Sequence, residues 1–246
     1  AMRAASRTAD RCRHPSRRCP GIATMTPVAP PNIEATEAAI RPYRPADRDA
    51  VYAICLGTGD AGGDAAALYR DPELIGHVYA GPYLELEPDL CFVLAEGDRV
   101  LGYVLGTRDS LRFGQACERD WFGPLRARYP MPEAAETGRD ARMMRLIHAG
   151  YRADPELAAW PAHLHIDLLP VAQGRGWGTR LLQRFLGRLD ELGAAGVHAL
   201  TGPANPRAMA FYGRCGFAPV KATPATIAYA MSLRRDQPWQ NPQQSG

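Results

Sequence analysis

Polar and apolar residues alternate along the stretch AHLHIDLLP, residues 162–170. Successive side chains of a strand point to opposite faces, so the alternation predicts a β-strand with two different faces. One face is apolar and carries Leu164, Ile166 and Leu168. The other carries the titratable residues His163, His165 and Asp167. Pro170 ends the strand, because proline has no backbone donor for a ladder.

A second periodicity follows within ten residues. Apolar residues recur at helical spacing along residues 179–192, on a stripe of Leu181, Leu182, Phe185, Leu186 and Leu189. This pattern predicts an amphipathic helix, and Gly193 is placed to end it. Residues 205–217, NPRAMAFYGRCGF, predict a shorter helix, with Asn205 at its N-cap and Pro206 at its first position.

The remaining periodic segments complete a mixed pattern. Short strands are expected at residues 39–44, 91–96, 100–107, 196–202 and 226–233, the second and third of them forming a hairpin around Gly97-Asp98. Helices are expected at residues 45–59, capped by Asp47, as one or two short helices in residues 64–90, and at residues 135–151. This order predicts an α/β (α+β) fold in which helices flank a mixed sheet.

The periodic segments also suggest how the chain is organised. We expect a single domain over residues 39–235, with residues 111–160 inserted before the strand at 162–170. Residues 1–38 lack core-forming periodicity and are expected to form a disordered or extension tail. The polar residues 236–246 are expected to form a loose C-terminal tail.

Three glycines lie within QGRGWG, residues 173–178, directly before the helix expected at 179–192. Glycine allows close approach of the backbone, and a helix N-terminus offers unpaired N–H groups, so the stretch favours a phosphate group. Gly178-Thr179-Arg180 lacks the Lys-Ser/Thr that ends a Walker loop. A dinucleotide fingerprint needs a third glycine where Thr179 stands. A tight turn without a ligand is the alternative interpretation.

Two motifs about thirty residues apart carry a family resemblance. The first is Q-x-x-G-x-G, at Gln173, Gly176 and Gly178; the second is N-x-x-A-x-x-F-Y-x-x-x-G-F, from Asn205 to Phe217. Together they resemble the GNAT superfamily of acyl-coenzyme A-dependent N-acetyltransferases. With the segments at 69–84 and 102–107, the chain looks similar to the acetyltransferase-like C-terminal domain of O-GlcNAcase and its free-standing bacterial relatives. The resemblance does not extend to the sugar hydrolase activity of O-GlcNAcase.

The resemblance implies a fold and a coenzyme site. A mostly antiparallel sheet of six to seven strands would splay where acetyl-CoA binds. The residues expected to contact the coenzyme lie at the strand end, in the glycine turn and on the short helix: Leu168, Leu169, Gln173, Gly174, Arg175, Gly176, Trp177, Gly178, Thr179, Asn205 and Tyr212. Arg175 either adds charge to a phosphate or is an ordinary solvated arginine.

The resemblance also implies roles in acetyl transfer. An amine acceptor must lose a proton, so a base is useful, and Asp167 is the candidate because it lies on the strand that the thioester would follow. It is otherwise a structural acceptor. In better-known GNAT enzymes the base occupies a strand position that would point to the opposite face from Asp167. Either a β-bulge reconciles the two positions or the base lies elsewhere. Tyr212 matches the tyrosine that protonates the departing thiolate; otherwise it packs the helix.

The acceptor pocket is expected to use residues that can equally belong to the core: Tyr69, Asp71, Tyr79, Tyr83, Trp121 and His165. The acceptor itself, a small-molecule or protein amine, is not specified by the sequence. We therefore expect an acetyltransferase; the alternative is a catalytically inactive pseudo-acetyltransferase that acts as a coenzyme-binding or interaction module. Such proteins can form homodimers through sheet edges.

Composition narrows the partners. Residues 1–24 hold six arginines and one aspartate, a net charge of +5. Because the whole 246-residue chain has a net charge of +3, residues 25–246 have a net charge of −2. A nearly neutral body argues against nucleic-acid binding. No apolar run reaches the roughly 18 residues of a membrane span. The cysteines show neither metal-ligand nor disulfide spacing, so we expect no metal and a reducing cytoplasmic compartment.

Overall fold

The structure is a computed structural model that describes residues 37–233. The tails expected at residues 1–38 and 236–246 lie almost wholly outside the described residues. Glu37 and Ala38 precede the first strand, and Ala38 already packs against one of the two hydrophobic cores.

One sheet of seven strands forms the centre of the described chain, in the order β1-β2-β3-β4-β5-β7-β6. The strands are β1 (Ala39–Pro42), β2 (Phe92–Glu96), β3 (Arg99–Thr107), β4 (Ala162–Leu168), β5 (Gly196–Thr201), β6 (Ala218–Ala222) and β7 (Ile227–Ser232). All neighbours are antiparallel except β4 and β5, which are parallel. The predicted mixed, mostly antiparallel sheet is confirmed.

Eight α-helices surround the sheet within residues 37–233. They are α1 (Arg48–Gly57), α2 (Leu74–Tyr79), α3 (Gly81–Leu86), α4 (Ser110–Ala116), α5 (Gly123–Arg128), α6 (Arg139–Ala149), α7 (Trp177–Glu191) and α8 (Pro206–Arg214). A π-helical turn, Cys117–Phe122, joins α4 to α5. Short 3-10 turns lie at Pro45–Asp47, Ala66–Leu68, Pro88–Leu90, Pro155–Leu157 and Pro170–Ala172.

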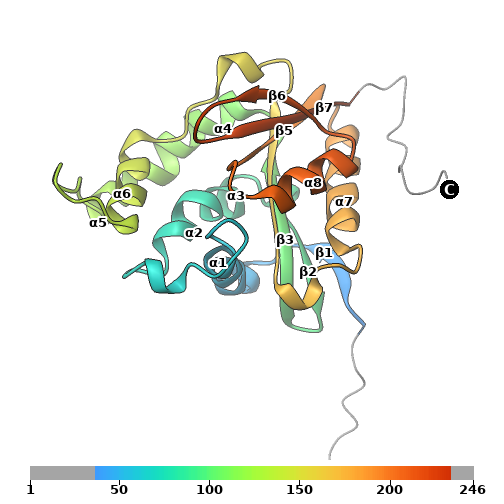
Figure 1. Ribbon diagram of the computed structural model, residues 1–246, viewed down its shortest axis with the longest axis horizontal. Coiled ribbons are helices and arrows are strands. Elements are labelled where there is room, and N and C mark those ends of the chain that lie inside the picture. Colours follow the sequence, from blue (N-terminus) through green and yellow to red (C-terminus); the bar gives the residue numbers. More distant parts are fainter. Residues whose placement is uncertain (1–36, 234–246) are drawn as a thin grey trace, which may run out of the picture. The chain divides into compact units, whose positions relative to one another are not determined.

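The two faces of the sheet build two hydrophobic cores. On one face, Tyr103 and Leu105 of β3 pack against the layer formed by helices α1 to α6. On the other face, Val104 and Leu164 pack against α7, whose predicted apolar stripe is buried throughout, and against α8. Figure 1 shows α1 to α3 and α7 on opposite sides of β3. Alternation along β3 and β4 thus assigns each strand residue to one core or the other.

Two local expectations were wrong. Asp47 was expected to cap α1, but its carboxylate accepts hydrogen bonds from Arg44 N at 2.8 Å and from the Arg41 guanidinium at 2.6 and 2.7 Å. It therefore anchors the turn before α1 to β1. Strand β6 was not anticipated, because its sequence APVKA contains Pro219 and lacks alternation. Its register against β7 shifts between Pro219 and Lys221, a feature typical of protected edge strands.

The segment at 111–160 is more helical than its sequence indicated. One helix was expected at residues 135–151, and α6 occupies its middle. Helices α4 and α5, with the π-helical turn between them, precede it. Helix α6 packs against α2, and the π-helical turn packs against α3. The segment therefore belongs to the helical layer over the β3–β4 face.

Gly106 of β3 tests how tightly this centre is packed. A Cβ at Gly106 would lie 2.3 Å from the carbonyl oxygen of His163 and 2.4 Å from Cζ of Phe185. We expect Gly106→Ala to lower the free energy of unfolding by about 1–3 kcal/mol, because neither neighbour can move freely. A Cβ built at Gly187 in α7 would have no other atom within 4 Å. Gly187→Ala should therefore raise the free energy of unfolding by about 0.5–1 kcal/mol. Urea unfolding measures both; equal effects would contradict the packing argument.

Candidate functional site

The site begins where β4 and β5 separate. The two strands pair only at Ala162 with Val197 and at His163 with His198. Beyond these pairs the remainder of β4 is bonded on its β3 side alone, where Leu169 N donates to Leu101 O at 2.9 Å. Because backbone polar groups alternate sides along a strand, those of Ile166 and Leu168 face the gap. The expected splay is therefore present.

The glycine turn lies beside this gap. Gly174 and Gly176 have φ values of 73° and 78°, a left-handed conformation that favours glycine. Gly176 is the N-cap of α7, and Arg180 N is the first amide bonded back, to Gly176 O at 3.1 Å. The preceding amides from residue 174 to 179 have no hydrogen-bond partner within the described part of the chain. Unpaired donors of this kind at a helix N-terminus can bind an anion.

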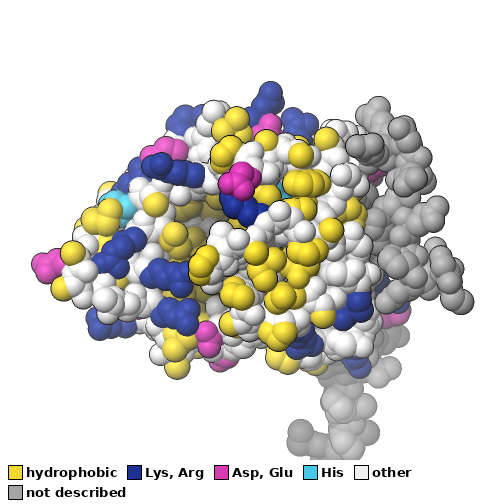
Figure 2. Space-filling model, turned by 45° about the horizontal axis from the view of Figure 1, so that its top comes forward, with side chains coloured by type: hydrophobic (Ala, Val, Ile, Leu, Met, Phe, Trp, Pro, Cys, Tyr) yellow, Lys and Arg dark blue, Asp and Glu magenta, His cyan; other side chains and the backbone are white. Residues whose placement is uncertain are grey.

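The gap and the turn together line a cleft of about 380 Å³, the glycine-turn cleft. Its walls come from α1 and the loop after it, β4, the glycine turn, and α8: Thr58, Gly62, Ile166, Asp167, Leu168, Gln173, Gly174, Gly176, Gly178, Thr179, Asn205, Arg207, Ala208, Phe211, Tyr212 and Arg214. Most of the residues expected to hold a coenzyme are among them. Figure 2 shows one face of the molecule, with hydrophobic side chains gathered around a hollow and Lys and Arg side chains on several sides.

Side chains fix the shape of the turn. Gln173 Nε2 donates to Leu168 O at 2.6 Å and so joins the turn to the end of β4. Asn205 Oδ1 accepts from Ala208 N at 3.0 Å and caps α8, as its sequence position predicted. A Cβ at Gly178 would lie 3.3 Å from Phe211 of α8, which shows how closely α7 and α8 approach at the cleft.

Three of the residues expected at the coenzyme site do not line the cleft. Leu169 packs against the opposite core, and Trp177 packs against the α7 core with the Arg180 guanidinium 4.7 Å above its ring. Arg175 is exposed outside the cleft lining. The positive charge on the cleft wall comes instead from Arg207 and Arg214 of α8.

Asp167 lines the cleft from the face of β4 that points toward the helical layer. Its Oδ2 accepts a hydrogen bond of 2.7 Å from the buried hydroxyl of Tyr103. Burial raises the pKa of Asp167 to about 6, and the hydrogen bond from Tyr103 opposes that rise. At pH 7 the carboxylate is mostly ionised, yet it is basic enough to accept a proton.

Tyr212 of α8 also lines the cleft. Its side chain is buried, stacks on Tyr229 with ring centroids 5.7 Å apart, and has no hydrogen-bond partner among the residues described. Burial raises the pKa of Tyr212, and the charge of Asp167 raises it further. The hydroxyl is therefore protonated at neutral pH and can serve as a proton donor.

The pairing of β4 decides one open question. A β-bulge was one way to reconcile the parity of Asp167 with the base of better-known acetyltransferases. Residues Leu168 to His163 pair with Gly102 to Thr107 without a register shift. No bulge is therefore present in this ladder, and Asp167 lies on the same face as His163 and His165.

The residues expected to bind an acceptor fall into two groups. Tyr79, Tyr83 and His165 lie together on a second cavity of about 190 Å³, the histidine cavity. It lies under the helical layer and is lined by Val78, Tyr79, Tyr83, Phe122, Leu146, Gly150, Tyr151, Arg152, His163, Leu164, His165, His198 and Leu200.

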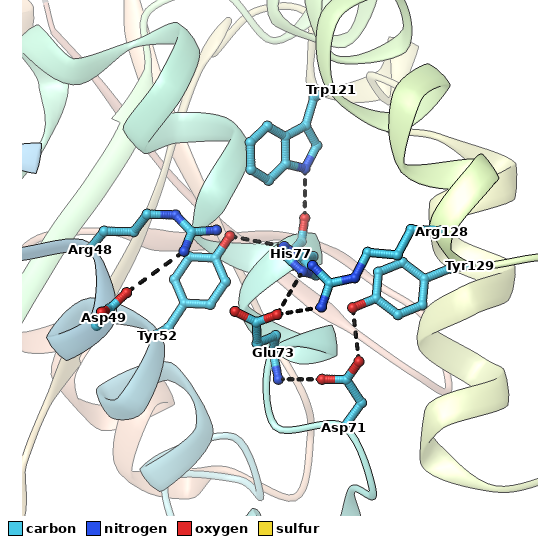
Figure 3. Close-up of polar contacts among 9 residues, drawn as sticks. All are labelled: Arg48, Asp49, Tyr52, Asp71, Glu73, His77, Trp121, Arg128 and Tyr129. Atoms are coloured by element: carbon cyan, nitrogen blue, oxygen red, sulfur yellow. Dashed lines mark hydrogen bonds and ion pairs between the residues drawn. The ribbon is translucent and has the colours of Figure 1, made fainter.

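Tyr69, Asp71 and Trp121 line neither cavity. Tyr69 is buried in the core of the helical layer. Figure 3 shows the other two in a cluster around His77. Trp121 Nε1 donates to His77 O at 2.8 Å, and Asp71 Oδ2 accepts from the Tyr129 hydroxyl at 2.8 Å. Both therefore join α2 to the segment at 117–129.

Several cleft residues were not anticipated from the sequence. Thr58 and Gly62 follow α1, about a hundred residues before β4, and no periodicity connects them to it. Tyr103, which does not line the cleft but donates a hydrogen bond to Asp167, was covered by the sequence only as one position of an expected strand. Arg207 and Arg214 carried a usable signal, since positions seven residues apart on a helix share a face.

Two further findings concern only the residues that the structure describes. No helix among them is long and apolar enough to cross a membrane. No group of three or more His, Cys, Asp or Glu side chains in residues 37–233 is arranged to hold a metal ion.

Burial raises the pKa of the Cys55 thiol to about 12, so this neighbour of the site is protonated.

Comparison with known proteins agrees with the two motifs. A sequence model of the acetyltransferase (GNAT) family matches residues 37–217. Protein O-GlcNAcase of Rattus norvegicus is 30% identical over 180 residues, which is 72% of this chain and 20% of that protein. Protein O-GlcNAcase of Mus musculus gives the same values. The chain thus spans about a fifth of the length of these curated relatives.

Solved structures show the same fold. The crystal structure of SsHAT has a TM-score of 0.76 and 44% sequence identity, and the match covers 79% of this chain and 98% of that one. PH1933 from Pyrococcus horikoshii OT3 has a TM-score of 0.53 at 14% identity, covering 80% and 99%. At that identity the second likeness concerns the fold alone.

The hydrogen bond from Tyr103 gives a direct test of the electrostatics at Asp167. This bond lowers the pKa of the carboxyl against the effect of burial. Tyr103→Phe removes the bond and keeps the ring, so we expect the pKa of Asp167 to rise above about 6. Carboxyl 13C NMR over a pH titration measures the change. An unchanged or lower pKa would show that the bond does not stabilise the ionised form.

Proposed function

The chain belongs to the acetyltransferase (GNAT) family, and on that premise we propose that it binds acetyl-CoA in the glycine-turn cleft and transfers the acetyl group directly to an amine. The observation that carries the proposal is the continuity of the cleft. Unpaired amides of the α7 N-terminus lie at one end, the free edge of β4 runs alongside, and Asp167 and Tyr212 lie at the other.

The described residues fit such a coenzyme. A diphosphate suits the amides of residues 174–179, since these donors point from a helix N-terminus. Arg207 and Arg214 supply positive charge to the phosphates. The amide-bearing arm of the coenzyme suits the gap-facing polar groups of Ile166 and the N–H of Leu168, as an added strand would, while Leu168 O is bonded to Gln173. When bound, the coenzyme supplies an activated acetyl thioester.

Asp167 acts as the general base in this proposal. A lysine-like amine with a pKa of about 10.4 is neutral in fewer than about one molecule in a thousand at pH 7. The ionised carboxylate attracts the ammonium form and accepts one of its protons, and the neutral nitrogen then bonds to the thioester carbonyl carbon. His165 suits this task less well, because burial lowers its pKa to about 4.

Tyr212 acts as the general acid. As the carbon–sulfur bond breaks, the sulfur gains negative charge, and the Tyr212 hydroxyl donates its proton there. The elevated pKa of Tyr212 keeps that proton in place until it is needed. The nitrogen then loses its second proton, which restores the Tyr212 hydroxyl, and Asp167 releases the first proton to solvent. The products are an acetylated amine and free coenzyme A.

An inactive coenzyme-binding module is the competing function. It would use the same glycine turn and the same arginines, so coenzyme binding alone does not separate the two functions. The raised pKa of Asp167 favours the enzyme, because a purely structural carboxylate gains nothing from it. Turnover separates them. The hydrolase activity named in the O-GlcNAcase relatives is not part of this proposal.

The first test concerns coenzyme binding. Gly178 lines the cleft and Gly187 is exposed on the same helix, so the same substitution can be made at both. We expect Gly178→Val to weaken acetyl-CoA binding by about tenfold or more, roughly 1.4 kcal/mol, because its side chain would fill the space between α7 and α8. Gly187→Val should bind like the wild type. Calorimetric titration measures both, and equal affinity would contradict the assignment of the cleft.

The second test separates base from acid. With Asp167 as the base, kcat/KM falls as the pH falls through about 6, because the protonated carboxyl cannot accept a proton. Asp167→Asn should lower the rate at pH 7 by about 10²–10⁴-fold. That defect should shrink toward high pH, where the amine loses its proton unaided. Tyr212→Phe should lower kcat to a similar extent at every pH, with the affinity for acetyl-CoA unchanged.

The measurement is a pH–rate profile of the wild type and both variants, with the rate monitored as release of free thiol. A wild-type rate for Asp167→Asn at pH 7 would make the carboxylate structural. Loss of coenzyme affinity in Tyr212→Phe would place the tyrosine in the binding wall. Acetyl-CoA binding without thiol release on a broad panel of amines would favour the inactive module.

A further inference from the structure

We propose that the histidine cavity is the acceptor subsite and that it takes a single uncharged aromatic ring, joined by a short chain to the amine that is acetylated. This inference rests on the proposed function and deepens it by naming a substrate class. The ring can belong to a free arylalkylamine or to the N-terminal residue of a peptide, and the two sources share the same chemistry.

The cavity adjoins the proposed catalytic end of the glycine-turn cleft. His165 lines the cavity and Asp167 lines the cleft, two residues apart on one face of β4. Two residues of strand span about 7 Å. A group held beside His165 can therefore present an amine to Asp167 when only a short chain separates them.

The size and the lining of the cavity suit one ring. A cavity of about 150 Å³ lined by apolar side chains is known to hold benzene. The histidine cavity measures about 190 Å³ and is walled mainly by aromatic and aliphatic side chains. Tyr79 and Tyr83 lie against His165 with ring centroids 5.8 and 5.3 Å apart, a spacing typical of aromatic contacts.

Polar groups in the cavity divide into satisfied and free ones. His163 is satisfied: its Nε2 lies 2.7 Å from the Tyr83 hydroxyl and its Nδ1 lies 2.7 Å from Ser110 Oγ. The ring of His165 and the hydroxyl of Tyr79 have no hydrogen-bond partner anywhere in residues 37–233. Two free polar groups in an otherwise apolar cavity are typical of a ligand site.

Charge limits the occupant further. No Asp or Glu lines the cavity in the described part of the chain, and Arg152 is exposed at its margin. Burial lowers the pKa of His163, His165 and His198, so all three are neutral at pH 7. A second ammonium group would therefore find no anion there. Polyamines and amines with a cationic side chain are poor candidates; a neutral ring with a hydrogen-bonding substituent fits.

Binding and turnover are measured on the full chain with matched probes. The amines are 2-phenylethylamine, tyramine, ethylamine and spermidine, and the peptides are Phe-Gly-Gly and Gly-Gly-Gly. Ligand-observed NMR with coenzyme A present reports binding without turnover, and thiol release with acetyl-CoA reports transfer. We expect kcat/KM for 2-phenylethylamine to exceed that for ethylamine by about 10–200-fold. Comparing the binding and the turnover of Phe-Gly-Gly with those of Gly-Gly-Gly shows whether the N-terminal residue of a peptide can supply the ring.

Two variants test the cavity itself. Leu200 lines it and is 51% exposed, so Leu200→Trp can narrow the cavity without disturbing the core. Leu111→Trp is the matched control, because Leu111 is also exposed, at 63%, and lines neither cavity. Leu200→Trp should weaken the two ring amines about tenfold or more in KM and leave acetyl-CoA affinity unchanged. Tyr79→Phe should weaken tyramine by about three- to tenfold and 2-phenylethylamine little.

The outcomes separate this inference from the proposed function. Ring-dependent binding that Leu200→Trp reduces supports the subsite even if no amine is acetylated, in which case only acetyl transfer is overturned. Acetylation of ethylamine or spermidine at least as efficient as that of the ring amines overturns the subsite and leaves the enzyme standing. Unchanged ring-amine binding in both Leu200→Trp and Tyr79→Phe also overturns it.

Discussion

Two residue pairs hold β4 beside β5, and the proposed active site depends on there being no more. Had the parallel ladder continued, the polar groups of Ile166 and Leu168 would be satisfied within the sheet. Because the ladder stops, the polar groups of Ile166 and the N–H of Leu168 are left free beside the glycine-turn cleft, while Leu168 O is held by Gln173 Nε2. Pairing of β5 with β7 on one side and of β4 with β3 on the other keeps the sheet together across the gap.

The same gap explains why one strand can serve two spaces. Residues of β4 alternate between faces, and the row from His163 through His165 to Asp167 runs along the helical-layer face. Near the pairs with β5 this row is closed in by α2, α3 and α6, which yields the histidine cavity. Farther along, α1 ends near Thr58 and the row opens toward α8, which yields the glycine-turn cleft. Asp167 therefore stands where the two spaces approach each other.

Local patterns predicted much of this arrangement, and long-range contacts account for what they missed. The alternation of β4, the stripe of α7 and the cap at Asn205 each depend on neighbours within a few residues, and each is present. Asp47 was misjudged because Arg41 competes for its carboxylate. Trp121 and Asp71 were expected at the acceptor because aromatic and acidic residues suit such a pocket. The fold of the helical layer, which no local pattern specifies, places them around His77 instead.

His163 and His165 show that residue type alone does not determine the role of a side chain. His163 is buried and His165 is half-buried, both have a lowered pKa, and they lie two positions apart on one strand. His163 is surrounded by Tyr83 and Ser110, so its polar atoms are satisfied and its role is to fix the strand against the helical layer. His165 meets ring faces and open space, so its polar atoms stay available. The nitrogens of His165 are not among the buried polar atoms that lack a partner in residues 37–233, so they stay accessible to solvent or to a ligand in the histidine cavity.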